Sequence, residues 1–128
     1  MDEKFCFVDL PGYGFARVSQ QTSNDWKELI EAYLLGRGNL ALSVILLDAR
    51  RGWMEKDLEL KSWLEFHDRR HLVVATKMDK LKSLSDQARG LDAIRRQCGA
   101  SEPVPFSAIT GRGVREIWQV IWTTQNRP

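Results

Sequence analysis

The 128-residue chain has little of several features that would assign it to a class at once. It has two cysteines, Cys6 in an expected strand and Cys98 on an expected helix, which favours small core residues over a disulfide framework. No apolar run approaches the roughly 20 residues of a membrane span. The acidic start, Met-Asp-Glu-Lys, resembles neither a signal peptide nor a transit peptide. We therefore expect a cytoplasmic protein that does not contact a membrane.

A strong charge imbalance is also lacking, since 19 basic and 17 acidic residues leave a net charge of +2. That value is too small to indicate a nucleic-acid partner by bulk electrostatics. Arginine pairs at 50–51, 69–70 and 95–96 are suited to an RNA backbone, but such scattered pairs are more often solvated surface. His67 and His71 have no cysteine nearby to complete a ligand set, so we expect no histidine metal site.

What the chain does contain is a regular alternation of apolar strand patterns and amphipathic helix patterns. Strands are expected over residues 5–8, 42–47, 72–75 and 103–106. Apolar residues at helical spacing lie within 26–34, 60–67, 84–98 and 114–122. The run at 42–47 is almost continuously apolar, which is typical of a strand buried on both faces. The sequence predicts one α/β domain, residues 1–128, with a mainly parallel sheet and flanking helices.

Polar residues follow three of these strands, where open parallel sheets bind their ligands. They are Asp9 with Gly12, then residues 76–79, then residues 107–111. A carboxylate such as Asp9 can hold hydrated magnesium, and Gly12, which has no Cβ, lets a backbone N–H approach a terminal phosphate. Alone, Asp-x-x-Gly is also an ordinary way to leave a strand and enter a turn. Asp48 ends another strand, and we interpret it as the cap of the turn that follows.

The three polar sets, in this order and spacing, resemble the Asp-x-x-Gly, Thr-Lys-x-Asp and Ser-Ala motifs of translation-factor-class GTPases. The wording Asp-Leu-Pro-Gly-Tyr-Gly-Phe-Ala at residues 9–16 is similar to that of the EngB (YihA/YsxC) family. The resemblance covers nearly the whole chain and includes threonine in place of the commoner asparagine at position 76. It implies the G-domain fold of P-loop GTPases and a guanine-nucleotide switch that acts in ribosome assembly and in normal cell division or septation.

The resemblance also implies a guanine site formed by Thr76, Lys77, Asp79, Ser107 and Ala108. The carboxylate of Asp79 would accept hydrogen bonds from N1–H and the exocyclic amine of guanine, a donor pair that adenine does not offer. Lys77 would lay its methylene stem along the base, and Thr76 would offer a hydroxyl group. Ala108 would present its backbone N–H to guanine O6, and Ser107 would shape the loop.

On the phosphate side, the resemblance implies that Asp9 holds Mg²⁺ through water and that Gly12 senses the γ-phosphate of GTP. Tyr13 and Gly14 would begin the second switch segment, residues 13–21. Tyr13 stands where many GTPases place a water-orienting glutamine, so we expect slow intrinsic turnover and assign no catalytic residue.

The sequence lacks the phosphate-cradling motif G-x-x-x-x-G-K-[ST] and a first-switch threonine region. The resemblance therefore implies an N-terminally incomplete G domain whose missing strand would lie between those at 5–8 and 42–47. Exposed strand edges would then favour self-association. GTP hydrolysis is implied for the complete domain, whereas the sequence gives little support for tight GTP binding or hydrolysis by this chain alone.

Two alternatives remain open at this point. The chain is either such a GTP-binding protein or a non-catalytic module that docks on the ribosomal large subunit or its RNA through the arginine pairs. An unrelated Rossmann-like enzyme is a third candidate, but the sequence has no G-x-G-x-x-G.

Overall fold

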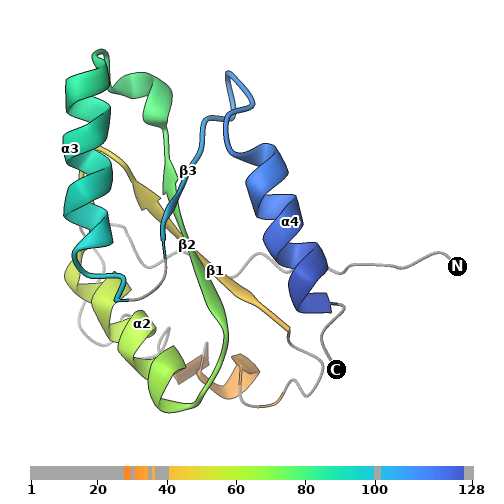
Figure 1. Ribbon diagram of the computed structural model, residues 1–128. Coiled ribbons are helices and arrows are strands. Elements are labelled where there is room, and N and C mark those ends of the chain that lie inside the picture. Colours follow the sequence, from red (N-terminus) through yellow and green to blue (C-terminus); the bar gives the residue numbers. More distant parts are fainter. Residues whose placement is uncertain (1–27, 30, 35, 37–40, 100–101, 126–128) are drawn as a thin grey trace, which may run out of the picture. The chain divides into compact units, whose positions relative to one another are not determined.

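The computed structural model describes residues 28, 29, 31–34, 36, 41–99 and 102–125 (Figure 1). The chain divides into two compact units, Met1–Leu40 and Ala41–Pro128. In the first unit the described residues are helical, in agreement with the helix expected over 26–34. The expected strand at 5–8 lies outside the described residues, as do Asp9, Gly12, Tyr13 and Gly14, so the predictions for them stay predictions.

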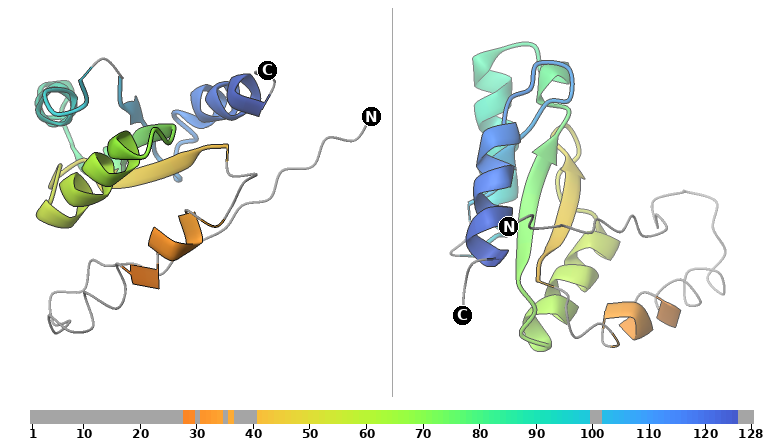
Figure 2. Two further views of the ribbon diagram at one scale, coloured as in Figure 1. Left: turned by 90° about the horizontal axis from the view of Figure 1, so that it is seen from below. Right: turned by 90° about the vertical axis from the view of Figure 1, so that its right-hand side faces the viewer.

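The second unit alternates strands and helices as predicted. In chain order its elements are β1 (Ser43–Asp48), α2 (Glu55–Phe66), β2 (His71–Thr76), the 3₁₀ helix η1 (Met78–Lys80), α3 (Leu84–Arg95), β3 (Val104–Pro105) and α4 (Val114–Gln125). The strands pair in parallel in the order β1-β2-β3. In Figure 1, α2 and α3 lie to one side of the strands and α4 to the other, and the view from below in Figure 2 shows the same division.

The strand register aligns the carboxyl ends of the strands. Asp48 at the end of β1 pairs with Thr76 at the end of β2, and Ala75 pairs with Pro105 of β3. The polar residues that follow β2 and β3 therefore emerge at one edge of the sheet. This is the edge at which parallel sheets bind ligands.

Two apolar layers cover β2. On one face Leu72 and Val74 pack with Val104 of β3 and with Ile117 and Val120 of α4. Because side chains alternate along a strand, the intervening residues of β2 point to the opposite face. The apolar residues of β1 and β2 on that face are also buried, at most 2% exposed, and they are Ile45, Leu47, Val73 and Ala75.

One expectation is wrong: β1 is not buried on both faces. Val44 is 41% exposed and Leu46 is 64% exposed. Their register partners in β2 are Leu72 and Val74, so all four belong to the face on which α4 packs. The α4 side chains in that cluster pack on β2 and β3, and β1 is left half covered. The face of β1 that carries Val44 and Leu46 is thus apolar and accessible. Self-association of the chain stays a prediction.

Helix α3 departs from its predicted pattern at one end. Its cap is Ser83, whose Oγ accepts a hydrogen bond from Asp86 N at 3.0 Å. Leu84, expected in the apolar stripe, is 84% exposed because it opens the first turn beyond the buried part of the helix. Cys98 lies just past the helix and is 5% exposed, as expected of a core residue, and burial raises the pKa of its thiol.

Candidate functional site

The end of β1 forms an ion pair at the shared sheet edge. Arg50 donates from Nε and Nη2 to the two oxygens of Asp48, at 3.0 and 2.7 Å. The backbone N–H groups of Arg50, Arg51 and Gly52 also donate to Asp48, so the interpretation of this residue as a turn cap is confirmed. The hydrogen bonds from Arg50 lower the pKa of Asp48 from 3.8 to about 2. Asp48 is therefore an anion throughout the physiological range.

Lys77 leaves β2 in a left-handed backbone conformation, with φ 59° and ψ 36°. For a residue with a side chain, this conformation costs about 1 to 2 kcal/mol. Lys77 Nζ lies 4.0 Å from Asp48 Oδ2, and the side chain is 59% exposed. The sharp turn thus places the long Lys77 side chain on the surface of this sheet edge, with its ammonium group near Asp48 at the end of β1.

Thr76 joins the ends of the two longer strands. Its Oγ1 donates to Leu47 O at 3.1 Å, and its carbonyl oxygen accepts from Ala49 N at 2.9 Å. The hydroxyl hydrogen is therefore used within the fold. The lone pairs of Oγ1 remain the part of this side chain that suits a ligand, so Thr76 can act there as an acceptor.

Asp79 and Ser107 meet at the centre of the edge, although they belong to different connections. Ser107 Oγ donates to Asp79 Oδ1 at 2.8 Å and accepts from the backbone N–H groups of Ile109 and Thr110, at 3.2 and 3.1 Å. A hydroxyl has one hydrogen and two lone pairs, so these three bonds use its whole capacity. Ser107 is 1% exposed, and its bond fixes the direction of the partly exposed Asp79 carboxylate.

The loop after β3 is closed by further hydrogen bonds between its own residues. Ser107 N donates to Arg112 O at 3.0 Å, Gly111 N donates to Ser107 O at 2.9 Å, and Arg112 N donates to Thr110 Oγ1 at 3.2 Å. Within the described part of the chain, the N–H of the exposed Ala108 has no hydrogen-bond acceptor. The edge therefore presents a carboxylate acceptor and a backbone donor, each held by the same serine-centred loop.

Helix α3 supplies a residue that the sequence did not single out. Gln87 Nε2 donates to Leu81 O at 3.1 Å and lies 3.5 Å from Met78 O, while its Oε1 accepts from Arg112 Nη1 at 2.9 Å. A glutamine within a helix is too ordinary to be noticed in a single sequence. Its role is visible only when the two loops are placed beside the helix.

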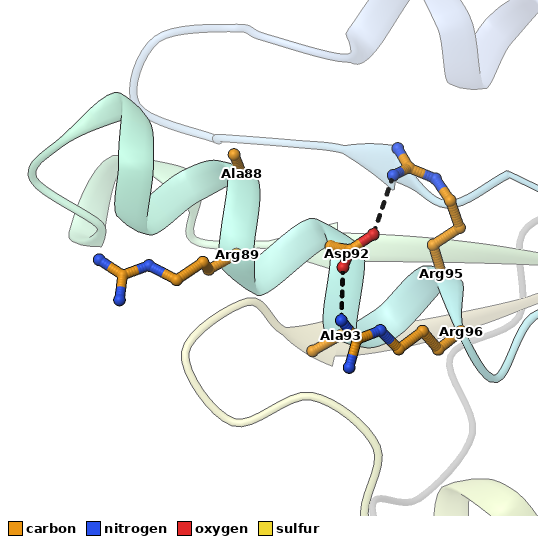
Figure 3. Close-up of a pocket in the computed structure, with 6 residues that line it drawn as sticks. All are labelled: Ala88, Arg89, Asp92, Ala93, Arg95 and Arg96. Carbon is orange, nitrogen blue, oxygen red and sulfur yellow. Dashed lines mark hydrogen bonds and ion pairs between the residues drawn. The ribbon is translucent and has the colours of Figure 1, made fainter.

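A shallow hollow of about 600 Å³ lies on α3 and holds the arginine pair at 95–96 (Figure 3). Its lining residues are Ala88, Arg89, Asp92, Ala93, Arg95 and Arg96. Asp92 pairs with Arg95 at 3.6 Å and with Arg96 at 3.0 Å, and Arg89 pairs with a carboxylate one turn earlier. These cations are thus already compensated, and none of the predicted site residues lines the hollow.

Other kinds of site find little support in the described residues. Across 41–99 and 102–125, and in the described helical residues before them, no three histidine, cysteine or acidic side chains are grouped to hold a metal ion. In the same residues no helix has the length and apolar character needed to cross a bilayer.

Solved structures similar to this chain include GTP-binding proteins. The chain superposes on a crystal structure of a probable GTP-binding protein EngB with a TM-score of 0.74, covering 93% of this chain and 76% of that one at 19% identity. It also matches Era in complex with MgGDPNP and nucleotides of 16S ribosomal RNA, with a TM-score of 0.68, 91% and 38% coverage, and 23% identity. These likenesses establish the fold as that of a P-loop GTPase.

Curated relatives make the assignment more specific. The chain is 61% identical over 97% of its length to the probable GTP-binding protein EngB of Solibacter usitatus (strain Ellin6076), and 42% identical over 94% to that of Syntrophus aciditrophicus (strain SB). No family model matches the sequence. The chain belongs to the EngB family, and it spans 63% and 62% of the length of these two relatives.

Proposed function

We propose that this chain reads guanine nucleotides at the edge formed by residues 76–79 and 107–112, as an EngB-type GTP-binding protein. One observation carries the proposal. The Asp79 carboxylate is fixed by Ser107 Oγ at 2.8 Å, and the loop that supplies this serine leaves the Ala108 N–H without an acceptor among the described residues. An acceptor and a donor held by one loop match the Watson–Crick edge of guanine.

The base chemistry explains the choice of guanine. Guanine offers N1–H and an exocyclic amine as neighbouring donors, with O6 as an acceptor beside them. Asp79 would accept from the two donors, and Ala108 N–H would donate to O6. Adenine places a bare N1 toward the carboxylate, which would leave a desolvated charge unpaired. We therefore expect the site to bind guanine more tightly than adenine, by on the order of several kcal/mol.

Two further residues complete the proposed base site. The exposed methylene stem of Lys77 would cover the base, with its ammonium group held near Asp48 at 4.0 Å. Thr76 Oγ1 donates to Leu47 O, so it would serve the ligand as an acceptor. The strained backbone of Lys77 supports this role, because such strain is often found at functional sites.

The phosphate side of the proposal depends on residues outside the described ranges. We propose that Asp9 holds Mg²⁺ through water and that Gly12 contacts the γ-phosphate; a carboxylate is a ligand that this hard cation prefers. Magnesium would offset phosphate charge when bound. Because the sequence lacks G-x-x-x-x-G-K-[ST], we expect this chain alone to bind nucleotide weakly and to hydrolyse GTP slowly or not at all.

We further propose that the complete protein works in the cytoplasm in assembly of the ribosomal large subunit, and through it in cell division and septation. The likeness to Era, solved with 16S ribosomal RNA of the small subunit, supports a ribosomal partner in general, and the choice of the large subunit rests on the resemblance to the EngB family. RNA docking through the arginine pairs alone is less favoured. Arg50 pairs with Asp48, and the pair at 95–96 shares Asp92, so much of their positive charge is already compensated.

The test is a titration of the chain with fluorescent GDP, competed by unlabelled GDP, ADP and xanthosine diphosphate. Asp79→Asn replaces an acceptor oxygen by an amide donor, so we expect weaker GDP binding and stronger binding of xanthosine diphosphate, whose C2 oxygen accepts a hydrogen bond. Asp86→Asn, an exposed change on α3, is the control. Failure to bind any nucleotide, together with salt-dependent RNA binding, would reverse the proposal in favour of a docking module.

A further inference from the structure

Helix α3 contacts both loops of the guanine site through one side chain. Gln87 donates to Leu81 O in the connection after β2 and accepts from Arg112 in the connection after β3, at 3.1 and 2.9 Å. We propose that Gln87 is a positioning residue that holds the acceptor and the donor of the base site at a fixed separation. This inference rests on the proposed function, because it concerns how the same site recognises guanine.

The contacts of Gln87 close a ring around the base-reading carboxylate. From Asp79 the ring passes to Ser107 Oγ, then through Ser107 N to Arg112 O, and from the Arg112 guanidinium to Gln87. Gln87 Nε2 returns it to the carbonyl groups of Met78 and Leu81, which flank Asp79 in the chain. Each loop is thus tied directly to the other and also to α3.

Without Gln87 the two loops would still share the Asp79–Ser107 bond and the bond from Met78 N to Phe106 O at 3.1 Å. They would, however, lose the hydrogen bond between Arg112 and Gln87, which attaches the loop after β3 to α3. The serine-centred loop could then rotate about its two remaining ties. Such rotation changes the separation between the Asp79 carboxylate and the Ala108 N–H, which guanine must match at the same time.

An amide is the side chain that this place requires. It donates to carbonyl oxygens on one side and accepts from a guanidinium on the other, and Gln87 is half buried between them. A carboxylate could accept from Arg112 but would face the Leu81 carbonyl without a donor. Methionine has a similar length and neither group. Gln87→Glu should therefore keep part of the effect of the wild-type residue, and Gln87→Met should lose it.

The proposal predicts a change in base selectivity. Inosine diphosphate lacks the exocyclic amine of GDP, so the ratio of GDP to inosine diphosphate affinity measures how well Asp79 meets both donors. We expect Gln87→Met to lower that ratio about 5-fold, the value of about one hydrogen bond, and Gln87→Glu to lower it less. Gln97→Met, at an exposed glutamine beyond α3, should leave the ratio unchanged.

A second readout needs no nucleotide. The N–H groups of Ile109 and Thr110 donate to Ser107 Oγ, so their hydrogen exchange reports on the loop that Gln87 restrains. In Gln87→Met both should exchange faster than in the wild type and in Gln97→Met. A variant that melts at a lower temperature but keeps the affinity ratio and both exchange rates would overturn the positioning role.

The two readouts separate this inference from the proposed function. If the wild-type chain binds neither GDP nor inosine diphosphate, the proposed function fails, and exchange at Ile109 and Thr110 alone decides whether Gln87 holds the loops together. If both nucleotides bind and the ratio is the same in Gln87→Met and the wild type, the function stands and the inference is wrong.

Discussion

Two glycines close the loop after β3, and they make different demands on the backbone. Gly111 has φ +83° and Gly113 has φ +90°, a region that residues with a side chain rarely adopt. A Cβ on Gly111 would meet no atom within 4 Å. On Gly113 it would overlap the carbonyl oxygen of Pro105 and lie 3.2 Å from Phe106 Cα. Only the second glycine is therefore required by a close approach as well as by its φ.

The pair Gly111→Ala and Gly113→Ala separates the two costs. Alanine at a positive φ costs about 1 to 2 kcal/mol, and both variants have this cost. Gly113→Ala adds an overlap with rigid backbone, worth about 1 to 3 kcal/mol by analogy with overpacked cores. We expect losses of about 1 kcal/mol for Gly111→Ala and about 3 kcal/mol or more for Gly113→Ala.

Thermal unfolding followed by circular dichroism measures both losses. For a unit of this size, each kcal/mol lowers the melting temperature by about 4–8 °C, so Gly113→Ala should melt about 10 °C or more below Gly111→Ala. The overlap should also disturb the site, because Phe106 O accepts the bond from Met78 N beside Asp79. Equal melting temperatures for the two variants would refute the close approach of Gly113 to β3.

Two further predictions concern the charged side of the edge. Asp48→Asn should lower the free energy of unfolding at pH 7 by about 1 kcal/mol, less than the full pKa shift implies because Arg50 is 45% exposed and screened. Since the folded-state pKa of Asp48 is lowered from 3.8 to about 2, the wild-type advantage should be complete above about pH 5 and be lost as the pH falls through about 2, as urea unfolding at a series of pH values will show. Lys77→Gly removes the strain of a left-handed residue, so its melting temperature should not fall, whereas fluorescent GDP should bind more weakly; a parallel loss of stability would contradict the assigned strain.

The strands show what a single sequence can and cannot predict. The runs at 42–47 and 72–75 look alike, and both form strands within a residue or two of the expected bounds. β2 lies between two strands and is buried on both faces, whereas β1 exposes Leu46. The difference depends on which strands α4 covers. That choice is made by tertiary packing and leaves no trace in the local pattern.

The residues of the candidate site likewise divide into those that the sequence predicts and those that only the tertiary structure reveals. Residues 76–79 and 107–111 could be found because polar groups directly after parallel strands must meet at one edge. The use of Ser107 as a three-bond centre, and the contacts of Gln87, could not be found in this way. They depend on distances between segments far apart in the sequence, and no local periodicity records them.

For the three strands that the structure describes, the order in space equals the order in the chain. Ser43 pairs with His71, and Val74 pairs with Val104, so β2 and β3 each join a strand that was synthesised about 30 residues earlier, and loop closure remains short. A ribosome adds about 5–20 residues per second, so β3 is synthesised within several seconds after β2. Translation and sheet growth therefore run in the same direction, and the base-reading edge is completed by the last loop to be made before α4.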